Sequence, residues 1–212
     1  MVKSKNDKIK PKLIKLKLSS KEKVIKNLIE HKEPRSILSI SGSAVLDYKN
    51  TYNIIDELQS GGIIIKETIG NTNPIRINFI PNQEIFSVEQ KRTEEFLSKN
   101  PKFRLIKEDI TELNYQFMIV LVFGSFVKGK STPVSDIDVC IISDNEEKTK
   151  QLIEMLNLLS LKLEIHAFTT DEFISMIEKT KNNLGHEIVK SNIILYGIEN
   201  YYNLISKWMK KE

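Results

Sequence analysis

Two aspartates lie on one side of an apolar strand near the middle of the chain. The segment "SDIDVCIIS" places Asp136 and Asp138 two residues apart among isoleucine and valine. Side chains alternate along an extended strand, so both acids project from the same face. Two neighbouring carboxylates repel each other unless a cation lies between them, and oxygen ligands suit a hard ion such as Mg²⁺. We therefore predict that Asp136 and Asp138 hold Mg²⁺.

A glycine-serine pair ends the apolar strand that comes before these acids. The run "YQFMIVLVF" leads into Gly124 and Ser125, and ten residues separate Ser125 from Asp136. Glycine lets the backbone approach a phosphate closely, and backbone N–H groups at the start of a helix bind anions. Lys128 and Lys130 follow shortly after this pair in the sequence. This pattern predicts a seat for the phosphates of a nucleotide, placed opposite a metal on the paired acids.

Taken together, these two segments resemble the nucleotidyltransferase superfamily typified by DNA polymerase beta, and especially its minimal nucleotidyltransferase group. The family pattern is close to Gly-Ser-x-Ala-x-Gly followed by Ser-Asp-x-Asp, and here it reads "GSFVKG" and "SDIDV". Val127 replaces the usual alanine, and Lys128 stands where arginine is common. The resemblance covers about residues 114–205. It implies a nucleotide site that contains Gly124, Ser125, Lys128, Lys130 and Ser135.

The same resemblance requires a third carboxylate from an adjoining strand. In "LKLEIHAF" the leucines and Ile165 alternate with Glu164, which therefore faces the opposite side. The family's mechanism implies that Asp136, Asp138 and Glu164 are both catalytic and metal-binding, with one or two Mg²⁺ ions. Glu164 would help to deprotonate the attacking hydroxyl. Glutamate is longer than the usual aspartate by one methylene group. His166 has the same parity as Glu164, and we interpret it as a structural residue.

The first part of the chain predicts three helices followed by a β-hairpin. Ser19 and Glu22 have the spacing of a capping box, and apolar residues recur along one helical face after them. A short second helix is expected to close at Gly42, and a third to start after Asp47 and end at Gly61. Two strands then flank a turn at residues 70–73. This order resembles a winged helix-turn-helix domain over residues 19–80.

In that resemblance the third helix is the recognition helix that enters a major groove, and the partner is DNA or RNA. The residues that it would offer to nucleic acid, together with one from the wing, are Tyr48, Lys49, Asn50, Thr51, Asn53 and Arg76. Asp56 and Glu57 follow within two turns and oppose such contact. The alternative is a module for dimerisation or for docking a protein partner, and a homodimer is compatible with either role.

Charge divides the chain unequally. Residues 1–79 hold 15 Lys and Arg against 8 Asp and Glu, a net charge of +7, whereas residues 80–212 hold 17 against 20, a net charge of −3. A basic first part favours a polyanionic partner such as nucleic acid. Ten lysines fall in the first 26 residues, however, and also fit a solubilising tail. Charge alone does not separate these interpretations.

The domain organisation that we expect is an α/β (α+β) chain in four segments. They are a basic N-terminal arm at 1–18, a winged helix-turn-helix domain at 19–80, a connecting helix and linker at 81–113, and a nucleotidyltransferase domain at 114–212 with a small mixed β-sheet flanked by helices. We expect the connecting helix to lie on the surface and to pack against one of its neighbours. The single cysteine, Cys140, cannot form an internal disulfide, and the longest apolar runs are shorter than the roughly 18 residues that a membrane helix needs. We therefore expect a cytoplasmic protein without a membrane partner.

These observations predict an Mg²⁺-dependent enzyme that moves a nucleoside monophosphate, with AMP from ATP as the expected group, to a hydroxyl of a protein or nucleic-acid acceptor. Two other functions stay open. By resemblance, minimal nucleotidyltransferases often act as antitoxins to a helical toxin protein, either by binding it or by modifying it. The chain could also be a DNA-binding transcription regulator whose transferase-like domain only senses a nucleotide.

Overall fold

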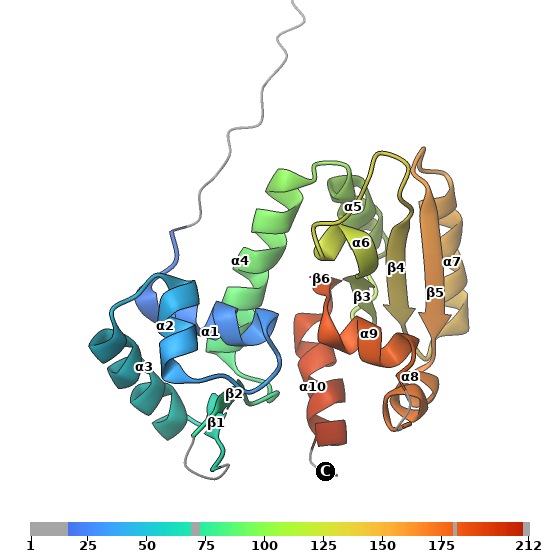
Figure 1. Cartoon of the computed structure of the whole chain (residues 1–212). Helices are drawn as coiled ribbons and strands as arrows, with labels where there is room; N and C mark the ends of the chain where they lie inside the picture. Colours follow the sequence, from blue (N-terminus) through green and yellow to red (C-terminus); the bar gives the residue numbers. More distant parts are fainter. Residues whose placement is uncertain (1–16, 69–72, 180–181, 210–212) are drawn as a thin grey trace, which may run out of the picture.

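The computed structural model describes residues 17–68, 73–179 and 182–209, and it has a mixed α/β architecture (Figure 1). A mostly helical first part is followed by a second part built on a four-stranded sheet. Most of the expected basic arm and residues 70–72 of the expected hairpin turn lie outside the described residues. No helix in the described ranges is long and apolar enough to cross a membrane.

The helices of the first part begin where the sequence places their caps. The Ser19 side chain accepts a hydrogen bond from Glu22 N, and the Glu22 side chain accepts one from Ser19 N, as a capping box requires. Asp47 caps the third helix in the same way, by accepting from Asn50 N. The helices are α1 (Ser20–Glu30), α2 (Ile37–Ala44) and α3 (Tyr48–Ser60).

The second helix ends later than the sequence predicts. We expected Gly42 to close it, but α2 continues to Ala44 and stops at Val45, which adopts a left-handed conformation with φ 54°. Gly42 is exposed and costs the helix only about 1 kcal/mol relative to alanine, which neighbouring contacts can offset. Gly61 caps α3 as expected, and Gly62 after it has φ +69°.

A two-stranded antiparallel sheet follows α3 in the order that the sequence predicts. It pairs β1 (Ile64–Lys66) with β2 (Ile75–Ile77). Arg35 adds a further bridge to this sheet, because its backbone N and O both bond to Ile75 at 2.8 Å. The loop between α1 and α2 is therefore fixed to the hairpin.

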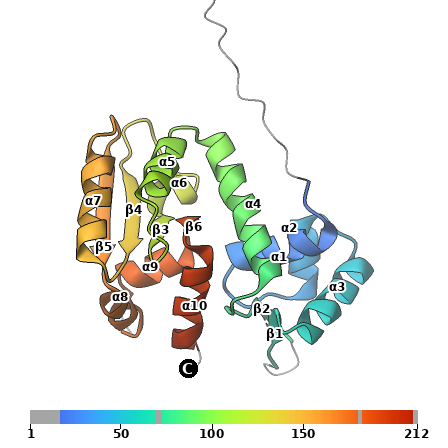
Figure 2. The ribbon, with the colours of Figure 1, turned by 180° about the vertical axis from the view of Figure 1, so that it is seen from behind.

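The long helix α4 (Gln83–Lys99) lies between the first part and the sheet, as both views show (Figure 2). The sequence predicted a surface helix that packs on one neighbour. Instead, Ile85, Phe86 and Val88 join the core of the first part, and Phe96 and Leu97 join a core on the other side of the sheet. A polar pair, Glu89 and Arg92, is buried on the same helix.

The second part contains a mixed sheet in the order β5-β4-β3-β6. β4 pairs antiparallel with β3 and parallel with β5, and β3 also pairs antiparallel with β6. This order places the strand that carries Asp138 next to the strand that carries Glu164. The elements are α5 (Phe103–Leu113), β3 (Ile119–Val122), α6 (Gly124–Val127), β4 (Ile137–Ile142), α7 (Glu146–Asn157), β5 (Leu163–Phe168), α8 (Thr170–Ile177), α9 (Leu184–Lys190), β6 (Ile193–Tyr196) and α10 (Ile198–Met209).

Alternation along the central strands gives each face of the sheet its own core. Val139 and Ile141 point to one face, which α5 and α7 cover, whereas Cys140 and Ile142 point to the other. Asp138 has the parity of Cys140. It therefore projects on the face that α8, α9 and α10 cover, at the end of the strand where those helices leave a hollow.

Candidate functional site

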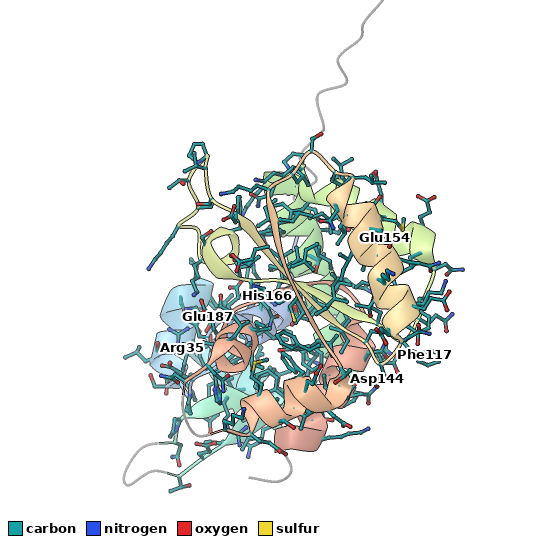
Figure 3. The ribbon with its side chains drawn as sticks, turned by 90° about the vertical axis from the view of Figure 1, so that its right-hand side faces the viewer. Arg35, Phe117, Asp144, Glu154, His166 and Glu187 are labelled. Atoms are coloured by element: carbon teal, nitrogen blue, oxygen red, sulfur yellow. The ribbon has the colours of Figure 1, made fainter. Side chains whose placement is uncertain are left out.

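A hollow of about 460 Å³ lies where β3 ends and β4 begins. It collects the turn after β3, the acid in β4, two residues of β5 and part of α9. Of these residues, His166 of β5 and Glu187 of α9 are labelled in Figure 3. Among the predicted site residues it brings together Gly124, Ser125, Lys128, Lys130, Asp138 and Glu164. The other lining residues are Phe123, His166, Leu184 and Glu187.

The backbone at Gly124 packs directly against the carboxylate of Asp138. Gly124 has φ +70°, and a Cβ atom at this position would lie 1.9 Å from Asp138 Oδ2. The next residue, Ser125, donates a backbone hydrogen bond to the same carboxylate. Glycine is thus required both for the left-handed conformation and for the close approach.

Asp138 is held in a setting that disfavours its charge. Burial raises the pKa of this carboxyl above its usual value, and the negative charge of Glu164 raises it further. The N–H of Ser125 opposes this effect, as does His166. A bound cation would reverse the balance, because it favours the ionised carboxylate.

Asp136 lies just before β4, outside the residues that line the hollow. Its Oδ1 atom is buried and forms an ion pair of 2.7 Å with Lys162 Nζ. The ammonium of Lys162 therefore balances the charge of Asp136 in this structure.

Glu164 is the neighbour of Asp138 on the adjoining strand. The two residues are Cα partners in the parallel register of β4 and β5. The Glu164 side chain is 57% exposed, and its Oε1 atom lies 3.3 Å from His166 Nε2. His166, which we interpreted as structural, also lines the hollow and packs against the ring of Phe123. A carboxylate and an imidazole in contact can hold and pass on a proton at this place.

The predicted phosphate-binding residues divide into two groups. Lys128 pairs with Glu187 of α9, and Lys130, which is exposed, donates its backbone N–H to Ser125 O at 2.9 Å. Ser135 lies outside the hollow, where its Oγ atom accepts from Thr132 N at 2.8 Å and closes a turn. Ser135 therefore shapes the loop between Lys130 and Asp136.

The carboxylates of the site supply the oxygen ligands that Mg²⁺ prefers, but their side chains do not converge on one point in this structure. In the described parts of the chain, no three His, Cys, Asp or Glu side chains are close enough together to hold a metal ion. Asp136 is paired with Lys162, and Glu164 with His166. The buried Asp136 Oδ1 atom, which now contacts the Lys162 ammonium, and the desolvated Asp138 carboxylate nevertheless fit a hard cation.

Sequence reasoning missed two residues of this site. Glu187 is 49 positions beyond Asp138 on α9, and a lone glutamate in an amphipathic helix gives no signal of its role. Lys162 precedes β5 with no motif around it. His166 did carry a signal, because it has the same strand parity as Glu164.

Helix α3, which carries all the residues predicted to contact nucleic acid except Arg76, lies on the outer side of the first part, away from the sheet (Figures 1 and 2). Tyr48, Lys49, Asn50 and Asn53 are exposed. Thr51 is a correction: its side chain is fully buried, and its hydroxyl donates to Asp47 O at 2.9 Å, since position 51 falls on the core face of the helix. Arg76 is paired with Glu67.

Gly124→Ala is expected to lower any activity of this site by about 100-fold, because a displacement of about 1 Å at a reacting group has that effect. The added methyl must push the Asp138 carboxylate away. Gly129→Ala is the matched control, since Gly129 has φ +65° but no atom within 4 Å of a Cβ. Equal activity of the two variants would contradict the steric explanation; thermal unfolding verifies that both are folded.

The sequence was compared with curated proteins and with models of protein families. No curated protein matches the chain. Residues 106–201 match the model of the family described as "Polymerase beta, Nucleotidyltransferase". The match begins within α5, which packs on the sheet, and it includes the whole hollow around Asp138 and Glu164. This match supports the assignment of the second part of the chain to the polymerase beta nucleotidyltransferase superfamily.

Proposed function

We propose that the protein is an Mg²⁺-dependent nucleotidyltransferase that moves a nucleoside monophosphate, with AMP as the expected group, from a nucleoside triphosphate to a hydroxyl of a macromolecule. The main support is the juxtaposition of Asp138, Glu164 and the Gly124 backbone around one hollow, within the residues that match the family.

In this proposal the acids and the turn have separate tasks. Asp136 and Asp138 would hold Mg²⁺, with Glu164 as a further ligand, and the ion would polarise the α-phosphate and neutralise its charge. The backbone after β3, with Lys128 and Lys130, positions the phosphates. Glu164, in contact with His166, accepts the proton of the attacking hydroxyl. A bond forms between that oxygen and the α-phosphorus, and the bond to pyrophosphate breaks.

The test is transfer of label from each of four α-labelled nucleoside triphosphates to the macromolecules of a cell extract, with Mg²⁺ and with chelator. Label that appears only with Mg²⁺ and active protein identifies the base and marks the acceptor. If nothing is labelled but the protein still binds nucleotide with metal, transfer is ruled out and a sensing role replaces it.

Glu164→Gln is expected to lower transfer by about 100-fold, which is the lower range for loss of a general base. Glu154→Gln makes the same change on the exposed face of α7, away from the hollow (Figure 3), and should leave the rate unchanged. An unchanged rate in Glu164→Gln would exclude the base role.

A further inference from the structure

A second and larger cavity, of about 1020 Å³, opens between the two parts of the chain. Residues 30–36 and Ser39 line one side, and residues between 182 and 191 line the other. We call this cavity the interdomain cleft. It adjoins the hollow around Asp138, because Lys128 and Glu187 line both. In Figure 3, His166, Glu187 and Arg35 lie in that order on one side of the molecule.

The carboxylates of the interdomain cleft are already neutralised. Glu187 is paired with Lys128, and Glu33 with Lys190 at 3.1 Å. Glu30 lies 3.6 Å from Arg92 Nε and 3.8 Å from Lys26 Nζ. In the described ranges, the two other cations of the cleft, Lys32 and Arg35, form no ion pair with a carboxylate.

Arg35 is held in place by neutral groups. Its Nη1 atom donates to Asn27 Oδ1 at 2.7 Å and to Ser43 Oγ at 3.2 Å, and its Nη2 atom donates to Ser39 Oγ at 2.6 Å. A guanidinium has five N–H donors, so these three bonds fix its position, leave two donors unaccounted for, and do not cancel its charge. Such a preorganised arginine is suited to a phosphate group.

Lys32 is a second cation of the interdomain cleft, but its amine is only partly protonated at neutral pH. Its Nζ atom donates to Val189 O across the interdomain cleft and lies 5.9 Å from the centre of the Phe79 ring. Burial lowers the pKa of Lys32 to about 7, although Glu89 opposes this. Arg35 is the better residue to test, because an arginine presents a planar fork of donors to a phosphate, whereas a lysine presents a point charge.

The lining of the interdomain cleft favours a polyanion over a protein surface. Pro34 is its one apolar side chain among the described residues, and the remainder are charged, hydroxyl, amide or imidazole groups. Protein interfaces depend on buried aromatic and aliphatic anchors, which this lining lacks. Phosphodiesters are bound by Arg, Lys, Ser and Asn side chains, which this lining has.

From this cleft we infer that the acceptor is a nucleic-acid strand, whose last phosphodiesters lie against Arg35 while its terminal hydroxyl reaches the hollow beside Glu164. The inference rests on the proposed function and specifies its substrate class. It also gives the first part of the chain a role in catalysis, through the α1–α2 loop and not through the exposed face of α3.

Binding of a fluorescent 12-nucleotide single strand, as RNA and as DNA, tests this inference separately from transfer. Arg35→Gln should weaken binding by about 10-fold and lower the slope of log affinity against log salt by about 1, as loss of one phosphate contact requires. Arg35→Lys keeps the charge and should recover part of the affinity, which distinguishes binding from damage to the fold. Arg104→Gln, an exposed arginine outside the cleft, should leave binding unchanged.

The comparison with Arg76→Gln decides between two binding surfaces, the interdomain cleft and the hairpin. If Arg76→Gln weakens binding and Arg35→Gln does not, the strand binds near the hairpin and the inference is wrong. If neither strand binds and label is transferred to a protein, the inference is also wrong, while the proposed function stands. If a strand binds through Arg35 but no nucleoside triphosphate gives transfer, the proposed function fails and the interdomain cleft remains a nucleic-acid site. RNA alone, DNA alone or both would each support the cleft and would identify the sugar that it accepts.

Discussion

Asp138→Asn is expected to lower the rate of nucleotidyl transfer by more than about 100-fold. Residues that merely support a metal ligand are worth about 10- to 100-fold, and Asp138 is a proposed ligand itself. Asparagine keeps the shape of the side chain and the contact with Gly124, so the loss would report charge and metal binding. Asp171→Asn on α8 is exposed, lies outside the hollow and should retain full activity in the same assay. A variant Asp138→Asn with near-normal turnover would place the metal elsewhere.

The same substitution is expected to stabilise the metal-free protein. Burial, and then Glu164, raise the pKa of Asp138, so the folded protein binds more protons than the unfolded chain between the ordinary pKa and the raised one. Stability from this group therefore falls as pH rises through that window, and at pH 7 the ionised carboxylate disfavours the folded state. In chelator at pH 7, Asp138→Asn should unfold at a higher temperature than the wild type. The difference should vanish below about pH 4, the ordinary pKa of aspartate.

A second measurement compares the unfolding temperatures of the wild type and Asp138→Asn with and without Mg²⁺. Added Mg²⁺ should raise the unfolding temperature of the wild type, because it binds the folded state, and should have little effect on Asp138→Asn. A lower unfolding temperature for the variant in chelator would contradict the expectation that the ionised Asp138 carboxylate destabilises the folded state.

Arg92→Met is expected to lower the free energy of unfolding by about 3–5 kcal/mol, the usual cost of removing one partner of a buried ion pair. Arg92 is 7% exposed and pairs with Glu89, which is 1% exposed. Desolvation opposes the charge of Arg92, but Glu89 and Glu30 outweigh it and raise the arginine pKa. Tyr202 donates to Glu89 Oε1 at 2.7 Å, and that bond alone cannot replace the guanidinium.

A double variant separates the charge from the packing. Arg92→Met combined with Glu89→Leu leaves no unpaired buried charge, so most of the lost stability should return. Arg104→Met is the exposed control, since its contact with Glu94 is 3.8 Å long and worth at most about 1 kcal/mol. Urea unfolding at pH 7 measures all three. A double variant as unstable as Arg92→Met alone would show that packing, and not the unpaired carboxylate, causes the loss.

Local rules made much of the fold predictable. The caps at Ser19 and Asp47 fixed the starts of two helices, and alternation placed Asp138 and Glu164 on the sheet. These features depend on neighbours in the sequence, and so the sequence displays them. The order β5-β4-β3-β6 depends on pairing between strands that are far apart in the chain, and no local pattern predicted it.

The sequence predicted the acidic residues of the site, but it did not predict the residues that contact them. Asp136 and Asp138 are marked by a motif, whereas Lys162 and Glu187 reach them from other elements. Thr51 shows the limit of reading one helix at a time. A threonine near the start of a helix can cap, face solvent or pack, and only the neighbours of α3 decide that it packs.

The position of α4 constrains how this protein can be divided. One continuous core joins Val24, Ile55 and Phe86 with Leu121 and Tyr202, so the helical part and one face of the sheet share their apolar contacts. A truncated chain that starts at α4 would expose the apolar side of this helix to water and would aggregate or fail to fold. Recombination between related genes could exchange the first three helices only together with the matching face of α4. The two parts therefore have to be exchanged together, because each depends on the other to fold.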